Sequence, residues 1–240
     1  MRYLLYILIG LIYFRPAMVA AQDLPAWFIN TPASTDMLYA VGYARAYEHA
    51  DSAIAMAVRD ADHQINLALS TKIYGERLFQ TLPGGRIVYQ GEIFREEPIR
   101  SIKAVYLDTV QTEDMILILA ASRPPNWVVP SYLTSSSPTP PGWVTELPES
   151  TSCMYALGVA PGYYYPEHSW LAAERQARQE LAYSFQTRQR QVMRSTKTSE
   201  YGVTASATAV HLQNLQVVAR WQSETIYFVL IKGQADWSDE

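Results

Sequence analysis

The chain has 240 residues and a formal net charge of −4, with 49% hydrophobic and 18% charged residues. This balance is typical of a folded globular protein and excludes an intrinsically disordered chain. The negative net charge also argues against a general nucleic-acid-binding protein, because such proteins present a basic surface.

The first 21 residues are predicted to be an export signal that is removed by cleavage. Arg2 gives the segment a positive start, residues 3–14 are an apolar run, and small residues precede Gln22. The apolar run is shorter than the about 20 residues that a membrane-spanning helix needs. An uncleaved N-terminal membrane anchor is the alternative interpretation. We therefore expect an exported protein that is periplasmic, outer-membrane-associated or extracellular.

Beyond this segment, one sequence pattern occurs twice. Ten of the 23 residues at positions 25–47 are identical to the residue 116 positions later, without a gap. The shared residues include Pro25, Trp27, Tyr39 and Gly42 in the first copy, and Pro141, Trp143, Tyr155 and Gly158 in the second. A match of this density indicates a duplicated unit. Positions kept in both copies are predicted to build the fold and not to perform chemistry.

Residues 23–122 are predicted to form the first unit. A short apolar run at 38–44 predicts a buried strand, and the apolar spacing across residues 50–69 predicts a helix. Residues 86–94 form a plausible strand, and residues 102–108 are predicted to pair with residues 115–121 in a hairpin. The unit is therefore expected to run strand, helix, strand, strand, strand.

Residues 123–140 are rich in proline and serine, which predicts an extended linker. Residues 141–240 then repeat the order of the first unit, with a strand at 154–160, a helix whose apolar stripe covers 170–185, a strand at 203–210, and a hairpin of 215–221 with 225–231. The predicted fold class is α+β, with two tandem repeats that each pack a long helix on a small, mainly antiparallel sheet. Each sheet keeps one open face, so docking of the two copies or oligomerisation is expected.

The acidic and histidine residues of the first helix could hold a metal ion only if they converged. The four candidates are His49, Asp60, Asp62 and His63, and the second copy has Tyr165, Gln176, Arg178 and Gln179 at the same positions. Because the set is not repeated and spans almost four helical turns, we predict a solvated polar face and no metal site. No nucleophile motif, phosphate loop or cofactor fingerprint is present, so we expect neither a cofactor nor an enzyme.

Glu174 stands where the first copy has Val58, on the core-facing side of the second helix. A carboxylate in apolar surroundings has a raised pKa and could act as an acid or a base. Arg178 lies one turn later, and an ion pair between the two explains the pattern without catalysis. An enzyme that uses Glu174 is therefore the weakest alternative.

The single cysteine, Cys153, cannot form an internal disulfide bond. It aligns with Met37 of the first copy, which predicts a buried thiol.

Two features predict contact surfaces. A basic stretch runs along and beyond the second helix and comprises Arg175, Arg178, Arg188, Arg190, Arg194 and Lys197. These cations lie at and beyond the C-terminus of the helix, where the helix dipole favours positive charge, and this structural role is the favoured interpretation. The alternative is attraction to an acidic protein partner or to an anionic envelope surface. Tyr164, Tyr165 and Trp170 lie before and within the start of this helix, where aromatic rings favour protein contacts. The alternative is a binding module for glycans or small ligands, in which Trp143, Tyr164, Tyr165 and Trp170 surround one pocket.

The order Pro-x-Trp, Tyr-Ala-x-Gly-x-Ala, alanine-rich helix and closing hairpin resembles the Lpp-twenty lipoprotein family of bacterial envelopes. The resemblance covers both copies, including Ala44 and Ala160, and Trp221 in the second hairpin is also similar to the family. It implies a non-enzymatic protein with a surface, flagellar or assembly role and protein partners in the envelope. The chain departs from the family in lacking a lipid-accepting cysteine after the signal, and the first hairpin lacks the tryptophan.

Overall fold

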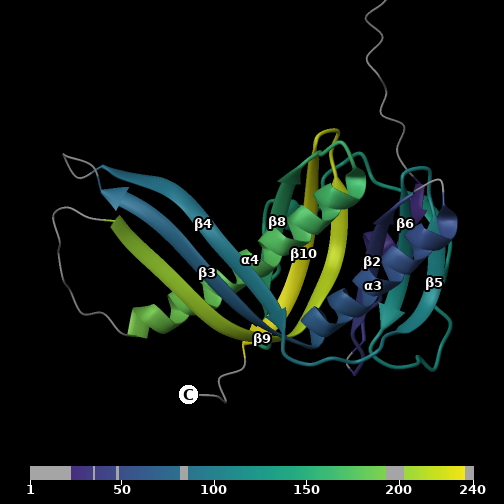
Figure 1. Ribbon diagram of the computed structural model, residues 1–240, viewed down its shortest axis with the longest axis horizontal. Coiled ribbons are helices and arrows are strands. Elements are labelled where there is room, and N and C mark those ends of the chain that lie inside the picture. The colour runs from purple at the N-terminus through teal and green to yellow at the C-terminus, as the bar shows by residue number, and fades with distance from the viewer. Residues whose placement is uncertain (1–22, 35, 47–48, 82–85, 193–202, 236–240) are drawn as a thin grey trace, which may run out of the picture.

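The computed structural model describes residues 23–34, 36–46, 49–81, 86–192 and 203–235 (Figure 1). The predicted export signal, together with Arg194 and Lys197 of the basic stretch, lies outside these residues. Within them, no helix is both long enough and apolar enough to cross a membrane.

The fold is mixed α+β, with helices and several antiparallel sheets, as predicted. The N-terminal half contains β1 (Asp23–Pro25), α2 (Ala26–Ile29), β2 (Tyr39–Arg45), α3 (Ala50–Leu69), β3 (Ser70–Thr81), β4 (Ile87–Pro98), β5 (Val105–Gln111) and β6 (Met115–Ala121). The remainder contains β7 (Leu133–Ser135), a 3₁₀ helix (Gly142–Val144), β8 (Met154–Pro161), α4 (Pro166–Val192), β9 (Val203–Gln222) and β10 (Ile226–Ala235).

The two long helices each lie directly on a strand because the facing residues are small. Ala57 and Ala61 of α3 are fully buried, and a Cβ atom added at Gly42 of β2 would lie 2.6 Å from that of Ala61. On α4, Ala173 and Ala177 are fully buried in the same way. A Cβ atom at Gly158 of β8 would lie 2.8 Å from that of Ala177. Both glycines therefore permit a close approach that a larger residue would prevent.

The three strands beneath α3 and the three strands beneath α4 are arranged in the same order. The three-stranded sheet has the order β2-β6-β5, and Gly42 pairs with Ile118. The last three strands of the five-stranded sheet have the order β8-β10-β9, and Gly158 pairs with Val229. In both places the first strand pairs with the last strand of a hairpin.

One sheet contains strands from both halves of the chain. Its order is β4-β3-β9-β10-β8, and β3 pairs with β9 from Ser70 opposite Gln213 to Gln80 opposite Val203. The hairpin of β3 and β4, together with the first part of β9, projects to the left in Figure 1 and runs beside the second half of α4. We call this projection the arm.

Two elements differ from the sequence-based prediction. The predicted strands at 203–210 and 215–221 are one continuous strand, β9, which pairs with β3 before Asn214 and with β10 on both sides of it. Asn214 has a φ of 54°. β3 was not predicted. It pairs with its neighbour β4 and also with β9, whose paired residues are more than 120 positions away in sequence and leave no local signal.

Aromatic rings join the two halves in the core. The ring of Phe28 packs edge-on against Tyr43 at 5.9 Å and against Trp170 at 5.3 Å between ring centroids. Trp170 packs in turn against Tyr227 at 4.7 Å. These contacts connect α2 and β2 with α4 and β10 in one hydrophobic cluster. The predicted linker also contributes structure, since its β7 pairs with β1.

Candidate functional site

A buried ion pair lies where the two halves meet. The side chains of Arg220 on β9 and Glu174 on α4 are 1% and 2% exposed, and Arg220 Nη2 lies 2.7 Å from Glu174 Oε1. Arg220 Nε also donates to the hydroxyl of Tyr43 at 2.9 Å, and Nη1 donates to the carbonyl oxygen of Phe28 at 2.9 Å. The hydroxyl of Tyr43 donates to the carboxylate of Glu174. A buried charge is tolerated only when it is paired and hydrogen-bonded in this way.

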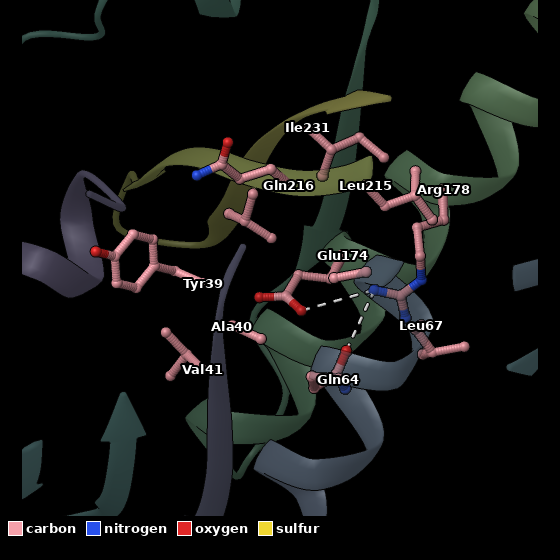
Figure 2. Close-up of a pocket in the computed structure, with 12 residues that line it drawn as sticks. Tyr39, Ala40, Val41, Gln64, Leu67, Glu174, Arg178, Leu215, Gln216 and Ile231 are labelled. Carbon is pink, nitrogen blue, oxygen red and sulfur yellow. Dashed lines mark hydrogen bonds and ion pairs between the residues drawn. The ribbon is translucent and has the colours of Figure 1, made fainter. Parts of the chain in front are cut away.

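A second buried arginine extends the pair into a network. Arg178 Nε and Nη2 donate to the two carboxylate oxygens of Glu96 at 2.7 and 2.9 Å. Its Nη1 lies 3.8 Å from Glu174 Oε2 and 3.5 Å from Gln64 Oε1. Figure 2 marks both contacts with dashed lines. Burial opposes the charge of Arg178, but the carboxylate of Glu96 and then that of Glu174 raise its pKa above the ordinary value. Arg178 therefore stays protonated.

The same surroundings shift the pKa of two neighbouring groups. Burial raises the pKa of Tyr43 well above its ordinary value; Arg220 opposes this shift and Glu174 adds to it. Burial also raises the pKa of Asp60 to about 6, although its hydrogen bond from the backbone N–H of Tyr43 acts in the opposite direction. We call Tyr43, Asp60, Glu96, Glu174, Arg178 and Arg220 the junction cluster.

A small cavity of about 30 Å³ adjoins the junction cluster, lined by Gln64, Glu174, Arg178 and Gln216 among apolar residues (Figure 2). A single buried water needs about 10–15 Å³ on this measure, so the cavity has room for water and not for a metabolite. The carboxylate of Glu174 is fully engaged by neighbouring side chains. Its chemistry is that of a structural counter-ion.

The metal candidates of the first helix are separated by their contacts. Asp60 accepts the N–H of Tyr43 at 2.8 Å, whereas Asp62 accepts the backbone N–H of Ala104 at 2.9 Å. Asp62 also accepts the hydroxyl proton of Tyr106. The prediction of a solvated polar face is therefore wrong for both aspartates, because they fasten α3 to β2 and to the segment that enters β5. Among the described residues, no group of three or more His, Cys, Asp or Glu side chains could hold a metal ion.

The aromatic candidates do not surround one pocket. Trp170 is 1% exposed and belongs to the core. Trp143 is partly buried in the 3₁₀ helix that follows the linker, while Tyr164 is 89% exposed. The predicted pocket of four rings is thus not formed, because the apolar stripe of α4 draws Trp170 inward.

Tyr164 belongs to a surface that three loops build. The N–H of Gly162 donates to the carbonyl of Thr225 at 2.7 Å, which holds the β8–α4 loop against the β9–β10 turn. The guanidinium of Arg45, at the end of β2, lies 3.8 Å from the ring centroid of Tyr165. The N–H of Ala46 donates to the carbonyl of Asp114, which places the β5–β6 turn beside them. We call six exposed residues of this region the loop surface: Glu113, Asp114, Tyr163, Tyr164, Glu224 and Ile226.

Two arginines of the predicted basic stretch make contacts within the protein. Arg178 is buried in the junction cluster, and Arg175 donates to the carbonyl oxygen of Phe94 on β4 at 2.7 Å. Arg188 and Arg190 lie near the C-terminal end of α4. Arg194 and Lys197 lie outside the described residues. The stretch is therefore not one continuous surface patch, because Arg178 points into the protein.

Cys153 is partly exposed, so the prediction of a buried thiol is wrong. It lies at the start of β8, beside an open hollow of about 740 Å³ lined by residues 147–151 and 153–155. Its neighbour Tyr155 has a pKa raised by burial and then by Cys153.

Sequence reasoning missed Tyr43, Glu96 and Arg220. The available signal was a single charged residue, Arg220, in the predicted strand at 215–221, which is otherwise apolar apart from Gln216. Such a residue is unusual in a strand with a buried face and requires a partner from elsewhere.

The chain was compared with known proteins, and no family model, curated protein or solved structure matches it.

Proposed function

We propose that this chain is a non-catalytic, exported protein of the cell envelope that acts by associating with other proteins. The loop surface carries this proposal. Tyr164 is 89% exposed and Tyr163 50% exposed, and Ile226 beside them is 38% exposed. Tyrosine is enriched at protein interfaces because it buries much apolar area at a low entropic cost, and its hydroxyl keeps a polar contact.

The proposal includes two tandem copies of one unit, of the kind found in the Lpp-twenty family. Besides the paired glycines, the copies share a contact at the same offset of 116 positions. The N–H of Tyr43 donates to Asp60, and the N–H of Val159 donates to Gln176, both at 2.8 Å. In each case a helix side chain satisfies the N–H of the residue that follows the glycine. Shared contacts of this kind support duplication more strongly than shared residues alone.

The contacts that Glu174 makes inside the protein favour association as the function of the chain over catalysis. A catalytic carboxylate must reach a reacting group, at about 2.6–3.2 Å or through one water. Glu174 already binds Arg220 and accepts from Tyr43, and its side chain is 2% exposed. These contacts support a structural role for the residue that is most unusual in the sequence.

The test is site-specific photo-crosslinking in cells that produce the protein. A photoreactive phenylalanine analogue replaces Tyr164, and the matched control replaces Glu149, which is also exposed but lies near the hollow beside Cys153. We expect a crosslinked species of higher mass at position 164 and none at position 149. The crosslinked species should fractionate with the cell envelope. An absence of crosslinks at position 164, or equal crosslinking at both positions, would contradict the proposal.

A further inference from the structure

An arginine already lies over a tyrosine ring next to the loop surface. The guanidinium of Arg45 is 3.8 Å from the ring centroid of Tyr165. This distance is well within the about 6 Å over which the face of an aromatic ring attracts a cation. Tyr165 packs edge-on against Tyr164, with 4.7 Å between the ring centroids. Tyr164 therefore lies directly beside an arginine contact, while it is itself 89% exposed.

The loop surface also holds three exposed carboxylates, Glu113, Asp114 and Glu224. Burial raises the pKa of Tyr227, and the charge of Asp114 raises it further, so this carboxylate lies close to the start of β10. Glu224 lies in the β9–β10 turn, directly before β10. The carboxylates of two different turns therefore act on the same region of the protein.

These carboxylates carry negative charge that the described part of the chain does not neutralise. None of the three forms an ion pair with another described residue. The positive end of the α4 dipole lies nearby, but Glu167 in the first turn of the helix offsets it. Glu167 is 5% exposed and is not part of the loop surface. A partner that binds here must therefore supply positive charge.

We infer that the loop surface binds arginine side chains presented by a partner protein. The inference rests on the proposed association function and names the chemistry of the partner. A guanidinium of the partner lies over the exposed ring of Tyr164, as that of Arg45 lies over Tyr165. The loop carboxylates accept its N–H groups. Arginine fits both contacts better than lysine, because its planar guanidinium stacks on rings and donates through a fork of N–H groups, whereas the lysine ammonium is a compact point charge.

Fluorescence anisotropy with two labelled peptides tests the inference on the purified chain. The probes are hexa-arginine and hexalysine, which carry the same charge and differ in the shape of the cation. At about 20 mM salt, where charges act over roughly 20 Å, we expect hexa-arginine to bind about 3-fold more tightly than hexalysine. Tyr164→Leu should remove this preference, whereas Tyr164→Phe should keep it, because a phenylalanine ring also attracts a guanidinium.

Two triple variants separate the loop surface from the general negative charge of the protein. The loop variant, which should bind both peptides about 10-fold more weakly, carries Glu113→Gln, Asp114→Asn and Glu224→Gln. The control variant removes three exposed carboxylates outside the loop surface and should bind as the unmodified chain does; it carries Glu97→Gln, Glu146→Gln and Glu149→Gln. Circular dichroism confirms that each variant is folded.

Equal affinity of the unmodified chain for the two peptides would overturn the inference, as would equal weakening by the loop and control variants. Retention of the arginine preference in Tyr164→Leu would also overturn it. A crosslink from position 164 in cells, together with no preference for hexa-arginine, would overturn this inference and leave the proposed function standing.

Discussion

The carboxyl group of Asp60 lies at the contact of α3 with β2, where it accepts the N–H of Tyr43 at 2.8 Å and a hydrogen bond from Gln64 at 3.3 Å. Burial raises its pKa from the ordinary 3.8 to about 6. The folded protein thus holds a proton that the unfolded chain releases between these two pH values. Stability from this group is greatest below pH 4 and decreases as the pH rises to about 6.

Asp60→Asn tests this dependence. The amide oxygen can still accept the N–H of Tyr43, and the second copy has an amide, Gln176, in this role. A pKa difference of about two units corresponds to ~3 kcal/mol, so the variant should be more stable than the parent by roughly 1–3 kcal/mol at pH 7. The advantage should vanish near pH 4. Urea unfolding at several pH values measures it, and parallel curves for the two proteins would show that the buried carboxyl does not titrate there.

At the scale of elements, each long helix rests on a strand through a glycine. A methyl group at Gly42 would collide with the backbone of Ala57, and one at Gly158 with the backbone of Ala173. Backbone atoms cannot rotate away as a side chain can, so the helix would have to move.

Gly42→Ala and Gly158→Ala should each lower the free energy of unfolding by about 2 kcal/mol or more. Gly142→Ala is the matched control, because nothing lies within 4 Å of an added Cβ atom there. It should change stability by less than about 0.5 kcal/mol. Thermal or urea unfolding gives the comparison. Equal losses in the free energy of unfolding at all three positions would mean that replacing any glycine is destabilising, and that the close approach of the helix to the strand is not the cause.

Both helices were predictable because their signal is local. Apolar residues three and four apart mark one face of a helix, and α3 covers residues 50–69 as that spacing predicts. The hairpin of β5 and β6 was predictable for the same reason, since its strands are adjacent in sequence. β3 was not predicted, although it pairs with its sequence neighbour β4, and its second partner, β9, lies in the other half of the chain.

For the whole molecule, the junction cluster links distant segments. Arg220 on β9 contacts Phe28 and Tyr43 in the first half of the chain and Glu174 on α4. Removing one member of a buried pair leaves the other charge without compensation, which commonly costs about 3–5 kcal/mol.

Arg220→Met and Glu174→Leu should therefore each destabilise the protein by about 3 kcal/mol or more, whereas the double variant should lose much less than their sum. Arg95→Met is the control, because its pair with Glu97 spans 3.8 Å between side chains that are 73% and 55% exposed. It should cost less than about 1 kcal/mol. A double-mutant cycle by urea unfolding measures the coupling. Strict additivity would show that the pair does not act as a unit.

The sequence by itself determined the α+β class, the two long helices and the two closing hairpins, because each follows from residues that are neighbours along the chain. It also singled out Glu174 as a carboxylate on an apolar face. Only the tertiary structure decided where Arg178 and Arg220 lie. A charged side chain can be buried only if a partner reaches it, and these partners come from strands and helices up to 192 residues away. The shared sheet of β3 and β9 was decided in the same way, by contacts between the halves that no local pattern contains.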